Sequence, residues 1–138
     1  MDIQTTCLCA KLRKASRVIT GIYDGFLAET GVKITQYSLL NNVKRLQNAT
    51  AAQLSQALLM DKTTLSRNLR LLVKRGYLAE TPGEDRRVKE LTLTEQGAKA
   101  LANARPAWLK AQKLLRESLG GSRMDRLFED LSALEELA

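Results

Sequence analysis

Two short capped segments in the middle of the chain constrain its fold most. Thr50 and Gln53 have the spacing of a capping box, which predicts a helix over Ala51–Leu58. After a short break, Asp61 can cap a further helix over Lys62–Arg75. Two short helices joined by a tight turn form the helix-turn-helix pattern.

A hairpin is predicted directly after the second of these helices. Tyr77–Thr81 and Val88–Leu93 are strand-like runs, and the polar loop Pro82–Arg87 joins them. Leu91 and Leu93 fall on one face of the second run, as in a half-exposed strand. A hairpin in this position is a wing, so the central fold is predicted to be a winged helix-turn-helix.

The N-terminal part is predicted to contain two helices. The first runs from Thr5 to Leu27, and a second, capped by Thr35, runs to about Leu46. The first helix carries an apolar seam of helical spacing, formed by Leu8, Leu12, Ala15, Ile19, Ile22 and Phe26.

Two more helices are predicted at the C-terminal end. A long one opens at Thr94, runs to about Leu119 and should bend at Pro106; Ser122 is expected to cap the last. The seam of the long helix comprises Gly97, Leu101, Ala104, Trp108, Ala111 and Leu115. The stripe of the last helix comprises Met124, Leu127, Phe128, Leu131 and Leu134.

These terminal seams exceed what so small a central module can cover, so we expect the end helices of two chains to pack together. The predicted fold is mainly α with a small β-hairpin wing. One domain is expected over 1–138, with dimerisation helices at 1–30 and 100–138 and the winged helix-turn-helix region at 34–95.

The helix over Lys62–Arg75 should present a basic face. Leu65, Leu69, Leu72 and Val73 form its apolar stripe, and the segment contains no acid. The chain carries a net charge of +7, and the C-terminal stretch 125–136 holds five acidic residues against one arginine. Bases interleaved with small hydroxyls suit phosphates and base edges, although a merely solvated basic face is the alternative. The residues predicted to contact DNA from this helix are Lys62, Thr63, Thr64, Ser66, Arg67, Arg70 and Lys74.

The wing supplies a second set of candidate contacts. Asp85 can brace one arginine while another reaches the minor groove, so Asp85, Arg86 and Arg87 complete the DNA-binding prediction. An ordinary surface turn is the alternative interpretation.

Several classes of function are disfavoured. The chain has no histidine and only two cysteines, and it shows neither a glycine-rich phosphate loop nor a paired carboxylate site. We therefore expect no enzyme, no cofactor and no metal site. Aromatic residues make up 4%, which leaves few platforms for stacking RNA bases. No signal peptide or membrane span is recognisable, so a cytoplasmic protein is expected.

The chain resembles the multiple antibiotic resistance regulator (MarR) family. The resemblance rests on Thr63–Leu69, on the wing with Asp85–Arg87, on Leu91–Thr94, and on Leu12–Arg17 through Thr35–Tyr37. It implies a homodimer that binds a pseudo-palindromic operator and is released by a small aromatic or phenolic ligand or by an oxidant. It also implies that Arg87, braced by Asp85, lies at the minor groove.

Two sensing mechanisms remain open. Cys9 and Tyr23 resemble positions of the organic-peroxide-sensing branch of the family, although Ile34 stands where a second tyrosine is expected and no distant resolving cysteine exists. In the alternative, Cys7 and Cys9 are ordinary small residues beside the seam.

The second mechanism is ligand binding. Arg13, Arg17 and Tyr37 could meet an aromatic carboxylate in a cleft between the end helices and the central module, or the two arginines are simply solvated or ion-paired. A winged-helix module that binds another protein without specific DNA binding is the alternative function for the whole chain.

Overall fold

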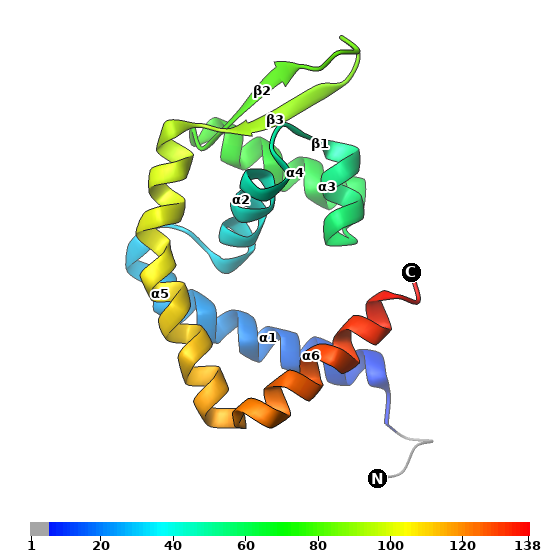
Figure 1. The fold of residues 1–138 in the computed structure, drawn as a ribbon, viewed down its shortest axis with the longest axis vertical. Coiled ribbons are helices and arrows are strands. Elements are labelled where there is room, and N and C mark those ends of the chain that lie inside the picture. The colour runs from blue at the N-terminus through cyan, green and yellow to red at the C-terminus, as the bar shows by residue number, and fades with distance from the viewer. Residues whose placement is uncertain (1–5) are drawn as a thin grey trace.

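The computed structural model describes residues 6–138, which form a helical protein with one small sheet (Figure 1). In chain order the elements are α1 (Leu8–Leu27), the 3₁₀ turn η1 (Ala28–Thr30), α2 (Ile34–Leu46), β1 (Ala49–Thr50), α3 (Ala51–Leu58), α4 (Lys62–Lys74), β2 (Leu78–Pro82), β3 (Lys89–Leu93), α5 (Glu95–Leu119) and α6 (Gly121–Glu135).

The predicted helix-turn-helix is confirmed as α3 and α4. The Thr50 hydroxyl accepts a hydrogen bond from the Gln53 backbone at 3.1 Å, and the Gln53 side chain accepts one from the Thr50 backbone at 2.9 Å. The Asp61 carboxylate accepts from the backbone N–H of Thr64 at 2.9 Å. Leu59 turns the chain between the helices with a left-handed φ of 49°.

The predicted hairpin is confirmed as β2 and β3, whose ends differ from the predicted ends by at most one residue. The sheet also has a third strand. β1 pairs antiparallel with β3, which places Ala49 opposite Leu91, and β2 pairs with the other edge of β3. Ala49 and Leu91 are both buried. A strand of two residues has no alternation to recognise, so β1 could not be predicted from the residue pattern.

The start of the N-terminal region differs in part from the prediction. Thr5, the expected first residue of the first helix, lies outside the described residues, and α1 begins at Leu8. Thr35 is not the cap of α2 but lies inside it. A residue of another helix instead caps the first residue of α2: the Asp24 carboxylate of α1 accepts a hydrogen bond from the backbone N–H of Ile34 at 2.8 Å.

The long helix α5 matches the prediction closely. The Thr94 hydroxyl accepts from the backbone N–H of Gly97 at 2.9 Å. The helix continues through Pro106 without a break, and its axis changes direction part-way along (Figure 1). Its predicted seam is buried throughout, except that Trp108 is half-buried. The predicted cap of α6 is wrong: Gly120 precedes the helix with a φ of 86°, and Ser122 lies within it without a capping hydrogen bond.

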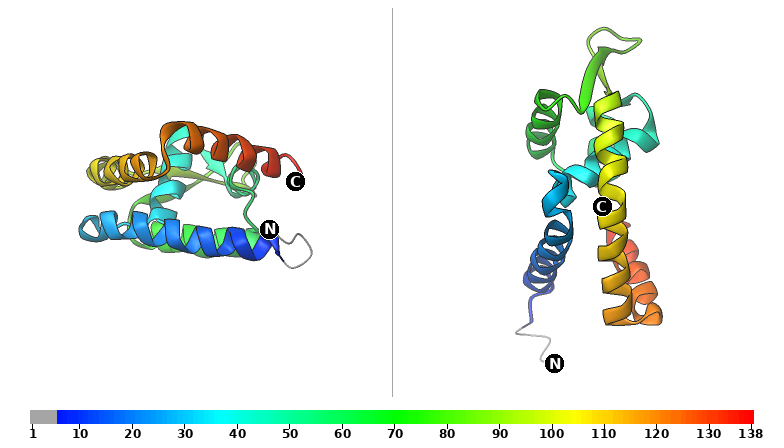
Figure 2. Two further views of the ribbon diagram at one scale, coloured as in Figure 1. Left: turned by 90° about the horizontal axis from the view of Figure 1, so that it is seen from below. Right: turned by 90° about the vertical axis from the view of Figure 1, so that its left-hand side faces the viewer.

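The central module and the end helices occupy opposite ends of the molecule (Figure 2). α1 packs against α5, and α6 folds back from the end of α5, so these helices extend away from the sheet. Much of their apolar surface is uncovered: Leu8 is 59% exposed and Phe128 is 54% exposed. No helix among residues 6–138 combines the length and the apolarity needed to cross a bilayer.

A close backbone approach at the start of α5 yields a first test. A Cβ on Gly97 would lie 2.1 Å from the carbonyl oxygen of Tyr77, far inside van der Waals contact. Gly97→Ala should therefore lower the free energy of unfolding by about 3 kcal/mol or more, although alanine is the better helix former. Urea denaturation followed by circular dichroism measures this loss.

Ala102→Gly, on the exposed face of the same helix, is the matched control and should cost only about 1 kcal/mol because it changes helix propensity alone. A Gly97→Ala protein as stable as the wild type would contradict the close approach.

Candidate nucleic-acid interface

The orientation of α4 is set by its apolar face. Leu65, Leu69 and Leu72 are buried in the core, with Val73 half-buried beside them, as predicted. The opposite face is exposed to solvent because α4 packs against the core through its leucine face only. All seven predicted DNA-contacting residues of this helix are exposed: Lys62, Thr63, Thr64, Ser66, Arg67, Arg70 and Lys74.

The exposed face of α4 is hollowed in two places. One depression lies along the helix itself and is lined by Lys62, Ser66 and Arg67 among others. The second is a groove where the start of α3, the middle of α4 and the wing meet. Three bases and one acid line it, so basic groups from the helix and the wing predominate on one concave surface; its polar lining residues are Thr50, Ser66, Arg70, Glu80, Arg87 and Lys89.

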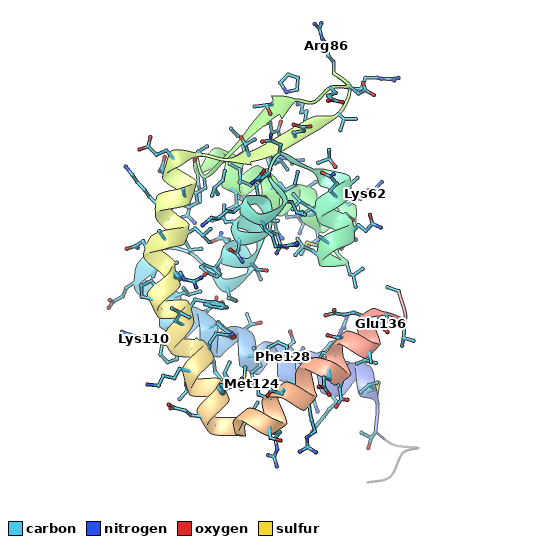
Figure 3. All side chains as sticks on the ribbon, in the orientation of Figure 1. Lys62, Arg86, Lys110, Met124, Phe128 and Glu136 are labelled. Atoms are coloured by element: carbon cyan, nitrogen blue, oxygen red, sulfur yellow. The ribbon has the colours of Figure 1, made fainter. Side chains whose placement is uncertain are left out.

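The two arginines of the wing differ: Arg87 is braced by a carboxylate, and Arg86 extends from the tip. The Asp85 carboxylate accepts from the backbone N–H of Arg87 at 3.0 Å and from its Nε at 3.4 Å. The loop is closed by the Gly83 N–H, which donates to the Val88 carbonyl at 2.9 Å. Arg86 extends from the tip of the wing, away from the rest of the molecule (Figure 3). The predicted brace between Asp85 and Arg87 is therefore present.

One acid lies at the start of the basic face, and it has a local role. The backbone N–H of Thr64 donates to Asp61 and holds the pKa of that carboxyl below its ordinary value, with a smaller contribution from the charge of Arg67. The stabilisation of the first turn of α4 is therefore fully present above the ordinary pKa of aspartate. It is lost only as the pH falls through the lowered value.

Two basic residues near the interface were missing from the predicted site. Lys89 faces the groove and also pairs with Glu80 across the hairpin at 3.3 Å. Arg75, at the end of α4, turns back toward the junction of α1 and α2, where it donates to the Gly31 carbonyl at 2.9 Å. The alternation of β3 could have indicated Lys89, but no local pattern reveals the contact of Arg75.

The structure does not bring the predicted ligand-binding residues together. Arg13 and Arg17 are exposed on α1. Tyr37 is only 4% exposed and stacks on Trp108, with ring centroids 5.7 Å apart and planes at 21°. Tyr37 was predicted at a cleft between the end helices and the central module, and in this structure its ring lies in the core, packed between α2 and α5.

The predicted redox residues also lie apart within one chain. Cys9 is exposed near the start of α1, and Tyr23 follows fourteen residues later, about 21 Å along the helix axis. The Tyr23 hydroxyl donates to the Gln112 side chain of α5. Partial burial raises the pKa of the Tyr23 hydroxyl. Tyr23 thus joins α1 to α5 in this structure.

Comparison with known proteins places this architecture in a family. A family model described as MarR family matches residues 30–88. Transcriptional regulator MosR of M. tuberculosis, solved in complex with DNA, superposes with a TM-score of 0.87 at 30% identity, covering 96% of both chains. The chain belongs to the MarR family. Its fold is a winged helix-turn-helix flanked by end helices.

Further relatives agree with this assignment. Curated relatives from Bacillus cereus, named as HTH-type transcriptional regulators, are 31% identical over 87 residues, which span 63% of this chain and 58% of theirs. The transcriptional repressor CouR bound to a 23-mer DNA duplex has the same fold, with a TM-score of 0.86 at 23% identity over 98% of this chain and 96% of that one. CouR has also been solved with p-coumaroyl-CoA.

The brace in the wing of this MarR-family protein can be tested by removing its carboxylate. Asp85→Ala should weaken DNA binding about two- to threefold, because Arg87 loses its preferred orientation even though a repulsive negative charge is removed. Fluorescence anisotropy with a labelled duplex measures the dissociation constant.

Glu84→Ala is the matched control, because it removes an exposed acid from the same loop. The Glu84 side chain makes no hydrogen bond or ion pair with any residue of 6–138. It should tighten binding slightly through charge alone. If both variants tighten binding equally, Asp85 acts only as a charge and the brace is irrelevant.

Proposed function

We propose that this MarR-family protein is a repressor that binds a pseudo-palindromic operator as a homodimer. The observation that carries the proposal is the exposed, acid-free face of α4 lying beside a wing with two exposed arginines. α4 with its cap residue Arg75 serves as the recognition helix over Lys62–Arg75, and the wing is Pro82–Arg87. In this assignment 34–95 forms the DNA-binding region of the single domain 1–138, and 1–30 and 100–138 supply the dimerisation helices.

The proposed contacts divide by chemistry. Arg67 and Arg70 can offer paired donors to guanine O6 and N7 in the major groove. Small hydroxyls at Thr63, Thr64 and Ser66 let the helix backbone approach, and Lys62 and Lys74 contact phosphates as point charges. Arg86 and Arg87 suit the narrow minor groove, with Asp85 as the brace.

The homodimer is supported by the apolar surface that one chain leaves open. Leu12, Ile19 and Phe26 lie on the predicted seam of α1, and Leu127 and Phe128 lie on α6; all are at least one-third exposed. A second copy would cover these faces. The N-terminal half of α1 is rich in lysine and arginine, whereas the second half of α6 is acidic. A contact between α1 of one chain and α6 of the other would therefore join opposite charges.

Dimer geometry determines the form of the operator. Two recognition helices related by a two-fold axis contact successive major grooves, so the half-sites should lie about 10 base pairs apart, centre to centre. A selection of bound fragments from random duplexes identifies the operator and checks this spacing in one experiment.

Release by an effector is the second part of the proposal. A small aromatic or phenolic ligand acting between the dimerisation helices and the central module, or oxidation of Cys9, would shift the separation of the recognition helices. Arg13 and Arg17 remain available to such a ligand on α1, whereas Tyr37 would take part only after leaving the core. Because the proposed protein acts on operator DNA, the proposal also includes a location in the cytoplasm.

The major-groove role can be tested with Arg67→Ala. This variant should lose about tenfold or more in affinity for the selected operator, because a bidentate arginine–guanine contact contributes about 1–3 kcal/mol. Gel-shift titration with operator and scrambled duplexes measures the affinity and the preference.

Lys110→Ala, on the exposed surface of α5 far from the wing, controls for the loss of one positive charge (Figure 3). An unchanged operator preference in Arg67→Ala would refute base reading by Arg67. A protein whose binding hardly depends on salt would instead favour the alternative of a protein-interaction module, because several phosphate contacts make affinity fall steeply with salt.

The dimer interface is tested with a charge on the uncovered apolar face. Phe128→Asp should convert the protein to a monomer at micromolar concentration, because an unpaired carboxylate would be buried between the helices. Sedimentation velocity measures the change.

Leu71→Asp, which places the same charge on an exposed leucine of α4, should leave the dimer intact. If the wild-type protein is monomeric, or if Phe128→Asp remains a dimer, the proposed interface is wrong.

A further inference from the structure

The chain passes twice between the end helices and the central module, and both crossings contact the same short segment. The first crossing lies at Gly31, between η1 and α2, and the second at Thr94, between β3 and α5. The segment they share is Arg75–Tyr77, which follows directly on α4. The end of the candidate recognition helix is therefore the point where the two parts of the molecule are joined.

Arg75 makes the connection at the first crossing. One terminal nitrogen donates to the Gly31 carbonyl at 2.9 Å, and the other lies 3.4 Å from the Gln36 side-chain oxygen. The same Gln36 oxygen accepts from the backbone N–H of Lys33 at 3.0 Å. Arg75 thus contacts both the turn that ends the first helical region and the first turn of α2.

The side chain of Arg75 is itself held in place by Tyr77. The guanidinium lies over the tyrosine ring, 4.8 Å from its centroid, and one nitrogen lies 3.2 Å from the tyrosine hydroxyl. A planar guanidinium can stack on a ring and donate from several nitrogens at once, whereas a lysine ammonium cannot reproduce this set.

The second crossing is tied to the neighbouring residues. The Thr94 hydroxyl donates to the Gly76 carbonyl at 2.6 Å, and the Thr94 backbone N–H donates to the Tyr77 carbonyl at 3.1 Å. α4 can therefore change its angle to α1 or α5 only if these contacts break or move together.

We propose that Arg75 is a positioning residue that sets the angle of the recognition helix to the dimerisation helices, and through it the half-site spacing that the dimer accepts. The inference rests on the proposed operator-binding function and deepens it. Arg75 is basic and follows α4 directly, yet the contacts above direct its guanidinium toward Gly31 and Gln36 in place of the exposed basic face. Its effect on DNA binding is therefore indirect.

The test compares a single half-site with a series of operators whose half-site separation is lengthened or shortened one base pair at a time. Arg75→Ala should bind the isolated half-site within about twofold of wild type. It should lose about tenfold on the operator of preferred spacing, and its dependence on spacing should be flatter. Arg75→Lys should behave like Arg75→Ala, because it keeps the charge and loses the guanidinium geometry.

The outcomes separate the possible failures. Equal losses on the half-site and on the full operator, or a wild-type response from Arg75→Lys, would make Arg75 a direct or merely electrostatic contact and overturn the inference. An unaltered spacing profile in Arg75→Ala would overturn it too. If the wild-type protein shows no preference for paired half-sites, the proposed function fails and the inference fails with it.

Thermal unfolding of each variant, with Lys110→Ala as the charge-matched control, identifies a folding defect. Should Arg75→Ala not fold, the spacing profile of Arg75→Lys decides the question alone.

Discussion

The packing of the leucine face of α4 determines where every basic side chain of the candidate interface points. Leu65, Leu69 and Leu72 enter the core that α2, α3 and the sheet also build. Burial of each such side chain contributes about 1.5–3 kcal/mol, much more than one exposed charge contributes to folding. The hydrophobic face therefore fixes the rotation of the helix about its axis, and the basic face follows from it.

The same reasoning explains why the two ends of the molecule differ. Most of the buried core residues belong to the central module, whereas α1 and α6 leave leucine, isoleucine and phenylalanine side chains in water. Exposed apolar surface of this extent on long helices is typical of an interface. A basic face whose direction is set by packing within one chain, together with an uncovered apolar face, favours the proposal of paired DNA recognition.

Local signals predicted the central fold well. The caps at Thr50, Asp61 and Thr94 depend on side chains within three residues of the groups they satisfy, so the sequence reveals them directly. The wrong cap predicted for α2 reflects a distant contact. Ile34 is capped by Asp24 from another helix, which the sequence around Thr35 could not indicate.

The same limit applied to the candidate site. The basic face and the Asp85–Arg87 brace could be predicted, because periodicity separates the two faces of a helix and a tight turn brings near neighbours together. The burial of Tyr37 against Trp108 and the redirection of Arg75 toward Gly31 could not, because each depends on how separate elements pack.

The most direct test of the account is the number of chains bound to one operator duplex. Native mass spectrometry of the wild-type protein with the selected duplex should show two chains per duplex as the main complex, and one half-site alone should bind far more weakly. A main complex of one chain per duplex, or equal binding to a scrambled duplex, would contradict the account.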